Sequence, residues 1–359
     1  MSLTRWKTII VGVAMVVIMA SAAGLMSCGS GGHKVQLKIS NAASLIVPFQ
    51  EIEKEFETRY PNIDVMLEGH GSIQVIRSVT ELGQDIDLAA VADYQLIPLL
   101  MYQAQMPDKS GPYADWCIKF ATNKLGIAYT ANSQYSAEIN AQNWYEILSR
   151  PDVRIGLADP RIDSLGYRAL IAIQLAQDYY QDNTLFKKLI IDNFSTGFEV
   201  TTIQGITTIK VPQLVKPTEK RISLRSYSIQ LLALLESGDI DYGFEYESVA
   251  KQRGLKFLEL PPEIALSSRE FADRYKQVRV ELGFQRFATI EPRFEGAQII
   301  YGITIPRNAK HPQEAEKFLE FLLGPDGQRI LAENYQPSLV PAEADGIDNV
   351  PAGLRQFIK

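Results

Sequence analysis

The chain contains few of the residues from which disulfide scaffolds and metal centres are built. Cys28 and Cys117 are its only cysteines, and it has three histidines among 359 residues. His33, His70 and His311 do not form any spacing used by metal ligands. The composition therefore argues against a disulfide framework and against a histidine-based metal site.

Motifs of common enzyme classes are also missing. The sequence has no Walker A loop, no HExxH, no G-x-S-x-G elbow and no G-x-G-x-x-G. The remaining composition is ordinary, with 46% hydrophobic and 22% charged residues, and the length is sufficient for two domains. We therefore expect a globular protein that is not an enzyme and carries no resident cofactor.

An apolar run near the N-terminus is typical of an export signal. Two positive charges precede residues 9–26, which are interrupted only by Gly, Ala and Ser. The run ends in Leu25-Met-Ser-Cys28, which resembles the lipobox of bacterial lipoproteins. We expect residues 1–27 to be a signal peptide, Cys28 to carry a lipid that anchors the protein to the membrane, and residues 28–34 to be a tether. The alternative is an uncleaved transmembrane anchor, and both place the remainder outside the cytoplasmic membrane.

The part of the chain after residue 27 is acidic. It has 34 Lys and Arg residues against 42 Asp and Glu residues, a net charge of −8. An acidic body repels phosphate backbones, so we expect no nucleic-acid partner. With a lipid on Cys28, Cys117 would have no partner for an intrachain disulfide.

Strand and helix patterns alternate in the first part of the chain. Residues 35–40 and 63–67 have strand patterns, and helical spacing follows each of them at 45–59 and 73–82. Residues 86–92 form an apolar run that suits a buried parallel strand. Such alternation predicts a parallel sheet with right-handed crossovers.

The second half repeats this alternation. A strand at 153–157 and a helix at 166–180 are followed by a helix at 226–236, which we expect to end at Gly238. A short strand then leads to Glu245, where a helix restarts. Residues 203–211 are rich in β-branched side chains around Gly205, which predicts a hairpin elaboration.

Two extended segments are predicted to join the halves. Residues 116–130 would cross to a second lobe, and residues 299–305 would return to the first. The fold class is then α/β, with two lobes, a two-strand hinge and a ligand cleft between the lobes. Lobe 1 would comprise residues 35–122 and 299–359, and lobe 2 residues 123–298.

Four polar side chains are predicted to stand where a strand gives way to a helix. Ser44 and Ser72 belong to lobe 1, and Asp163 and Glu245 to lobe 2. Ligands bind at this edge of open α/β sheets, and helix N-termini attract anions. Two interpretations of the serines remain open: they cap helices, or they contribute hydroxyls to an anion pocket.

Several segments resemble one known family in collinear order. They are Ala43-Ser-Leu-Ile-Val-Pro-Phe49, Gly71-Ser72, Val91-Ala-Asp-Tyr94, Asn143-Trp-Tyr-Glu-Ile-Leu148, Arg150-Pro-Asp-Val153, Asp163-Ser-Leu-Gly-Tyr-Arg168, Leu231-Leu-Ala-Leu-Leu235, Asp241-Tyr-Gly-Phe-Glu-Tyr246, Tyr301-Gly-Ile-Thr-Ile-Pro306, and Gln336-Pro with Leu339-Val-Pro341. Over most of residues 35–341 the chain is similar to the tungstate/molybdate-binding proteins of the archaeal-type ABC importer. The resemblance implies a type II periplasmic-binding-protein fold and a monomeric, lipid-anchored receptor that delivers the oxyanion to a permease and its ATPase.

The resemblance also implies the ligand set. In that family one Asp and one Glu of the second lobe bring the metal to six-fold coordination, and the matching residues are Asp163 and Glu245. Serines resembling Ser44 and Ser72 hydrogen-bond the oxyanion oxygens. Gly166 and Tyr167 are assigned to the site with them.

The loop that carries Asp163 departs from the family pattern. Ser164 replaces a proline and Leu165 replaces a cysteine. The loss of the proline loosens the loop, so Asp159 remains a rival for the second carboxylate ligand. Arg168 and Arg225 are candidate counter-charges.

Two carboxylates beside a dianion require an explanation, because like charges repel. The arrangement is favourable if the carboxylate oxygens bond to the central atom, as molybdenum(VI) and tungsten(VI) allow and sulfur does not. The alternative is a receptor for another tetrahedral oxyanion, such as sulfate, held by hydrogen bonds alone.

Overall fold

The structure is a computed structural model that describes residues 34–218, 221–282 and 292–359. The predicted signal peptide at 1–27, the lipidation site Cys28 and all but the last residue of the tether lie outside these ranges. Within the described ranges no helix is long and apolar enough to cross a membrane.

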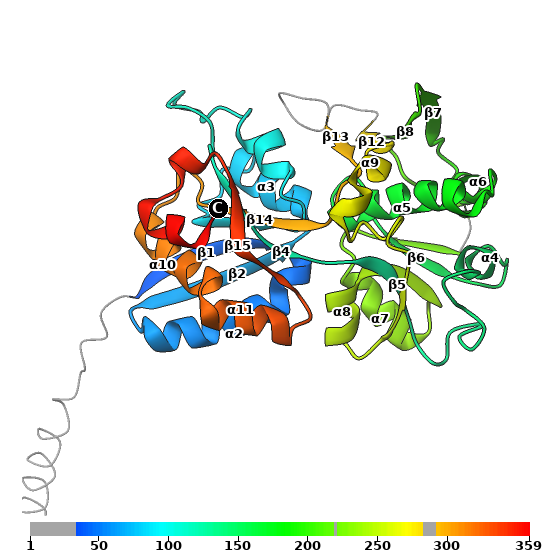
Figure 1. Ribbon diagram of the computed structural model, residues 1–359, viewed down its shortest axis with the longest axis horizontal. Coiled ribbons are helices and arrows are strands. Elements are labelled where there is room, and N and C mark those ends of the chain that lie inside the picture. Colours follow the sequence, from blue (N-terminus) through cyan, green and yellow to red (C-terminus); the bar gives the residue numbers. More distant parts are fainter. Residues whose placement is uncertain (1–33, 219–220, 283–291) are drawn as a thin grey trace, which may run out of the picture.

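The chain forms two α/β lobes that lie side by side (Figure 1). Lobe 1 is built on a six-stranded sheet with the order β15-β4-β14-β3-β1-β2. Its strands are β1 (Val35–Ala42), β2 (Ile63–His70), β3 (Leu88–Val91), β4 (Cys117–Thr122), β14 (Ile300–Thr304) and β15 (Ser338–Asp345). β1 runs parallel to β2 and β3, whereas β14 is antiparallel to β3 and β4.

Helices of lobe 1 pack on this sheet through regularly spaced apolar residues. They are α2 (Ile46–Arg59), α3 (Ser72–Thr80), α10 (Pro312–Leu323) and α11 (Pro325–Glu333). α2 buries Phe49, Ile52 and Phe56, which recur every three or four residues on one face. The rings of Phe49 and Phe56 both meet Phe318 of α10 edge-on.

Lobe 2 repeats the strand order of lobe 1. Its main sheet has the order β11-β5-β10-β6-β9 and consists of β5 (Leu125–Tyr129), β6 (Ile155–Ala158), β9 (Ile222–Arg225), β10 (Tyr242–Tyr246) and β11 (Lys256–Glu259). In each lobe the first parallel strand lies between the second and the third, and an antiparallel strand follows the third. The predicted two-lobed α/β fold is thereby confirmed.

The helices of lobe 2 include the most deeply buried helix of the described chain. They are α4 (Trp144–Leu148), α5 (Ser164–Tyr180), α6 (Leu185–Leu189), α7 (Gln230–Ser237), α8 (Glu247–Gln252) and α9 (Ala272–Tyr275). α5 buries every residue from its start to Ala176. α7 ends at Gly238, as predicted, with φ of 76° in the left-handed region that glycine tolerates.

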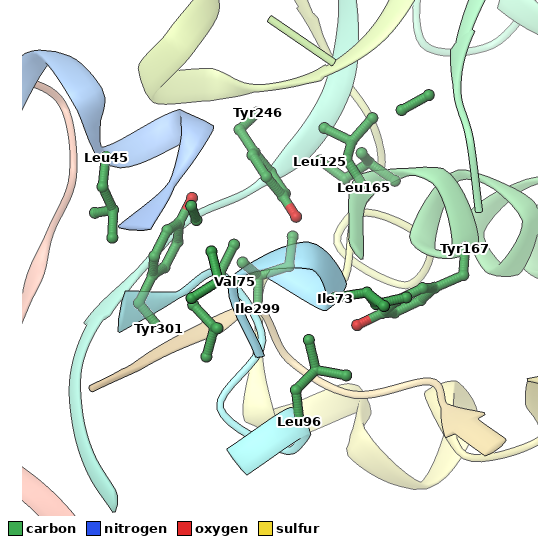
Figure 2. Packing of buried hydrophobic residues seen from close by; sticks show 14 of the residues in the cluster. Leu45, Ile73, Val75, Leu96, Leu125, Leu165, Tyr167, Tyr246, Ile299 and Tyr301 are labelled. Atoms are coloured by element: carbon green, nitrogen blue, oxygen red, sulfur yellow. The ribbon is translucent and has the colours of Figure 1, made fainter. Parts of the chain in front are cut away.

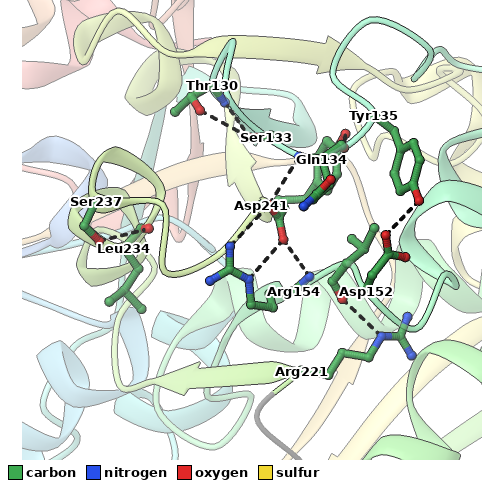
Figure 3. A network of polar contacts seen from close by, with 12 residues as sticks. Thr130, Ser133, Gln134, Tyr135, Asp152, Arg154, Arg221, Leu234, Ser237 and Asp241 are labelled. Atoms are coloured by element: carbon green, nitrogen blue, oxygen red, sulfur yellow. Dashed lines mark hydrogen bonds and ion pairs between the residues drawn. The ribbon is translucent and has the colours of Figure 1, made fainter.

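A buried carboxylate fixes the start of β10. Asp241 accepts hydrogen bonds from the Arg154 backbone N–H at 2.9 Å, from Arg154 Nε at 3.2 Å and from the Gln134 backbone N–H at 3.2 Å (Figure 3). β10 is therefore held at one end by this network, and Glu245 lies near its other end.

The predicted crossings coincide with strand pairs. Residues 116–130 contain β4 of the first sheet and β5 of the second, so the chain changes lobe at Asn123 and Lys124. It returns to lobe 1 in β14, within the predicted segment 299–305. Figure 1 shows both stretches running between the lobes.

A third sheet extends lobe 2 and was predicted only as a hairpin. Its order is β13-β12-β8-β7, with β7 (Glu199–Ile203), β8 (Ile206–Val211), β12 (Val278–Leu282) and β13 (Arg293–Glu295). β7 and β8 form an antiparallel hairpin, whose second strand lies within the predicted segment 203–211 and whose first strand precedes it except for Ile203. β12 pairs with β8 in parallel, a pairing between distant segments that no local pattern indicates.

Candidate functional site

The four predicted polar side chains lie at the carboxyl ends of parallel strands. Ser44 follows β1 in a short 3-10 turn, Ala43–Leu45, and Ser72 follows β2 as the first residue of α3. Asp163 lies after β6 and caps α5, and Glu245 is the fourth residue of β10. All four are buried, at the edge where open α/β sheets bind ligands.

Neither serine caps a helix. Ser44 Oγ lies 2.9 Å from the hydroxyl of Tyr301. Ser72 Oγ accepts a hydrogen bond from the Ala92 backbone N–H at 3.0 Å and lies 3.3 Å from Ser164 Oγ of lobe 2. The helix-cap interpretation is therefore wrong for both, because each hydroxyl interacts with groups far away in sequence.

Asp163 and Glu245 are brought together by Ser228. The Ser228 backbone N–H donates to Asp163 Oδ2 at 2.9 Å, and its hydroxyl donates to Glu245 Oε1 at 3.3 Å. Sequence analysis missed Ser228. Its signal is topological, because it follows the second strand of its sheet, as Ser72 does in lobe 1.

One oxygen of Glu245 has no hydrogen-bond partner among the described residues. Oε1 accepts from the Tyr246 backbone N–H at 2.8 Å, whereas Oε2 is buried and unpaired. Burial, with a smaller contribution from the neighbouring Asp163, raises the pKa of Glu245 to about 8, against the lowering effect of the Tyr246 N–H and the Ser228 hydroxyl. Burial also raises the pKa of Asp163, against the lowering effect of the Leu165 and Ser228 N–H groups. Unpaired buried polar atoms are rare in folded proteins, and binding of a ligand is one explanation for them.

The rival carboxylate, Asp159, is already paired. Its Oδ1 accepts from Arg161 Nε at 2.8 Å, and its Oδ2 lies 2.5 Å from a guanidinium nitrogen of the same arginine. Only Asp163 shares a hydrogen-bonded neighbour with Glu245. The geometry thus favours Asp163 over Asp159 as the second carboxylate of the site.

The next turn of α5 contacts lobe 1. Tyr167 Oη donates to Asp93 Oδ2 at 2.6 Å, and Arg168 Nη1 donates to the Ala92 carbonyl at 2.8 Å. The Tyr167 hydroxyl, which was assigned to the ligand, thus binds Asp93 across the lobes. Gly166 serves packing, since a Cβ there would lie 2.6 Å from the Ala158 carbonyl oxygen.

The comparisons with known proteins agree with this architecture. Residues 37–335 match the family model of bacterial extracellular solute-binding proteins. The chain belongs to that family. A solute-binding protein of Methanoculleus marisnigri is 39% identical over 91% of this chain and 88% of its own length, and one of Petrotoga mobilis is 39% identical over 90% of both. Membership implies an extracytoplasmic location and a role in transport rather than catalysis.

Solved structures share the fold of this solute-binding protein at low identity. The periplasmic molybdate-binding protein of Azotobacter vinelandii has a TM-score of 0.53 at 15% identity, covering 84% of this chain and 98% of that one. The sulfate-binding protein SubI of Mycobacterium tuberculosis also has 0.53, at 13% identity and 90% coverage of both chains. These matches support the periplasmic-binding-protein fold.

Among its described residues, the solute-binding protein has one buried arginine at the site. Arg168 is 3% exposed and lies 3.4 Å from Asp93. Arg225, the other candidate counter-charge, is exposed and donates to the Leu224 carbonyl, so it is not a buried counter-charge of the site. Its place at the end of an edge strand directs it to solvent.

Apolar side chains surround the polar groups. Figure 2 shows Val75 of α3 near Tyr301, and Ile73 of the same helix near Tyr167 of α5. Hydrogen bonds and charges act more strongly in such surroundings than in water. Among the described residues no group of three or more His, Cys, Asp or Glu side chains could hold a metal cation.

Proposed function

We propose that the protein is the extracytoplasmic receptor of an ABC importer for tungstate or molybdate. The observation that carries the proposal is the buried pair of Asp163 and Glu245, with Glu245 Oε2 unpaired. Two carboxylates repel a dianion unless their oxygens bond to its central atom. Tungsten(VI) and molybdenum(VI) are hard centres that accept additional oxygen ligands.

In this proposal the two carboxylates complete six-fold coordination of the metal. The hydroxyls of Ser44 and Ser72, with amides at the starts of α3 and α5, bind the oxyanion oxygens. The lobes close on the ion, and a permease with its ATPase takes over the cargo. The receptor acts as a monomer, anchored by a lipid on Cys28.

A sulfate receptor is the second candidate. The buried hydroxyls of Ser44 and Ser72 would suit any tetrahedral oxyanion, and the fold is also that of a sulfate-binding protein. Against it stands the carboxylate pair, because sulfur cannot take the additional oxygens and sulfate would gain no bond to offset the repulsion from the two carboxylates.

Titration calorimetry with tungstate, molybdate and sulfate separates the two candidates. We expect tungstate or molybdate to bind at least about 100-fold more tightly than sulfate, because removing one well-placed charged interaction costs a few kcal/mol. Comparable binding of sulfate would overturn the proposal.

Variants provide the control for this titration. Glu245→Gln keeps the shape of the side chain and removes its charge, so tungstate affinity should fall further than in Ser44→Ala. An equal or smaller loss in Glu245→Gln would count against direct coordination.

A further inference from the structure

Two hydroxyls at the lobe contact each accept a hydrogen bond from a nitrogen donor. Ser72 Oγ accepts from the Ala92 backbone N–H at 3.0 Å, and Tyr246 Oη accepts from Arg168 Nη1 at 2.7 Å. An amide N–H and a guanidinium can only donate. The hydrogens of Ser72 and Tyr246 must therefore point to other acceptors.

Ser164 is the acceptor within reach of both. Its Oγ lies 3.3 Å from Ser72 Oγ and 3.3 Å from Tyr246 Oη, and the residue is fully buried at the start of α5. The three hydroxyls have three hydrogens, but there are only two hydroxyl–hydroxyl contacts, so one hydrogen has no acceptor within the cluster. Both contacts are also long, because O–H···O bonds usually measure about 2.7–2.8 Å. The cluster of Ser72, Ser164 and Tyr246 can therefore exchange its weak internal bonds for bonds to a guest.

The same arrangement recurs on the other side of the site. Asn123 Nδ2 donates to Tyr301 Oη at 3.2 Å, and Tyr301 lies 2.9 Å from Ser44 Oγ. The amide of Asn123 is oriented by the Lys124 N–H, which donates to its Oδ1 at 2.9 Å. Tyr301 can therefore donate its hydrogen to Ser44 Oγ, and in that arrangement the Ser44 hydrogen is available to a ligand.

The charge of the site creates a need for such donors. A dianion beside Asp163 and Glu245 concentrates negative charge, and the buried Arg168 is already shared with Asp93 and Tyr246. Buried negative charge is stable only when donors surround it. Hydroxyls that accept hydrogen bonds from nitrogen donors can donate their own hydrogens to the anion, so no further cation is required.

We propose that Ser164 and Tyr246 bind the oxyanion together with Ser44 and Ser72, each donating its hydroxyl hydrogen to an oxygen of the ligand, with Arg168 holding Tyr246 in place. This inference rests on the proposed function and adds two residues to its site. The competing explanation is that the cluster only joins the lobes, since Ser72 and Ser164 come from different lobes.

The test compares two hydroxyl deletions with matched controls in the full chain. Tyr246→Phe and Ser164→Ala remove the proposed donors. Tyr275→Phe and Ser78→Ala remove buried hydroxyls that bond to the carbonyls of Pro262 and Gln74, away from the site. Each variant is titrated with tungstate and with molybdate by calorimetry, and its melting temperature is measured without ligand.

We expect Tyr246→Phe and Ser164→Ala each to weaken binding by about tenfold, the effect of losing one hydrogen bond to a charged group. The two controls should bind like the wild type. Losses in the site variants no larger than in the controls would overturn the inference while leaving the proposed function intact. A wild type that binds neither ion would overturn both.

A crystal structure with tungstate provides a readout that does not depend on stability. The inference requires Tyr246 Oη and Ser164 Oγ at hydrogen-bond distance from oxyanion oxygens. If the two hydroxyls instead remained bonded to each other beside the bound ion, the cluster would serve only to join the lobes.

Discussion

Glu245 is a buried acidic side chain that is only partly satisfied by hydrogen bonds. Its carboxyl group is buried, one oxygen lacks a partner among the described residues, and burial raises its pKa to about 8. A buried unpaired oxygen costs about 1–3 kcal/mol. Without a ligand the protonated carboxyl is the stable form near neutral pH, so the empty site differs in charge from one in which Glu245 bonds to a metal.

The raised pKa of Glu245 predicts how the stability of the ligand-free protein changes with pH. An unfolded glutamate ionises near 4.5, whereas Glu245 in the folded protein stays protonated until about pH 8. Between these values the folded state binds more protons, so the free energy of unfolding should fall as pH rises, by up to about 1.4 kcal/mol per unit. Below about pH 4.5 this contribution should be constant.

Urea denaturation of the wild type and of Glu245→Gln at several pH values between 5 and 8 measures this effect. The variant cannot ionise at position 245, so its stability should change less over the range. The same slope in both proteins would mean that Glu245 does not titrate as its burial requires.

At the scale of elements, α5 connects the site to the opposite lobe. Asp163 caps its start, and Arg168 on the next turn lies against Asp93 and the Ala92 carbonyl of lobe 1. Arg168 also donates to Tyr246 of β10. One helix end therefore positions a carboxylate of the site and holds the two lobes together.

Replacing Arg168 should reveal this connection. Arg168→Leu leaves Asp93 buried beside Tyr167 without its cation, and the loss of one partner from a buried ion pair costs about 3–5 kcal/mol. The free energy of unfolding, measured with urea, should fall by about that amount. Arg225→Leu, at an exposed arginine, should change it by less than about 0.5 kcal/mol. Equal effects would contradict the assigned role of Arg168.

Local patterns predicted the elements that carry the site. The positive φ of Gly238 ends α7, and the alternation of Ile240, Tyr242 and Phe244 with other residues identifies β10, because both signals act through neighbouring residues. All five residues of β10 are buried, so the alternation in sequence does not correspond to an exposed face. The start of α2 was predicted one residue early, since a 3-10 turn at Ala43–Leu45 precedes it. The pairing of β12 with β8 joins segments about 70 residues apart in sequence, and no local signal specifies it.

At the scale of the whole molecule, the main sheets of the two lobes have corresponding strand orders, and the carboxyl ends of their parallel strands supply the residues of the site. Ser72 and Glu245 could be located from the sequence because each lies where a strand gives way to a helix. Sequence analysis missed Ser228 and the contact of Ser164 with Ser72, which depend on how loops from separate segments meet. Contacts of this kind depend on the order of strands in the sheets and on the placement of the lobes, and no single stretch of sequence determines either.

The most direct test of the central claim is the coordination number of tungsten in the complex, read from a crystal structure or from X-ray absorption. The account predicts six oxygens around the metal, with Glu245 and Asp163 each contributing carboxylate oxygen to the four of the oxyanion. A four-coordinate ion surrounded only by N–H and O–H groups, with Glu245 turned away, would contradict it.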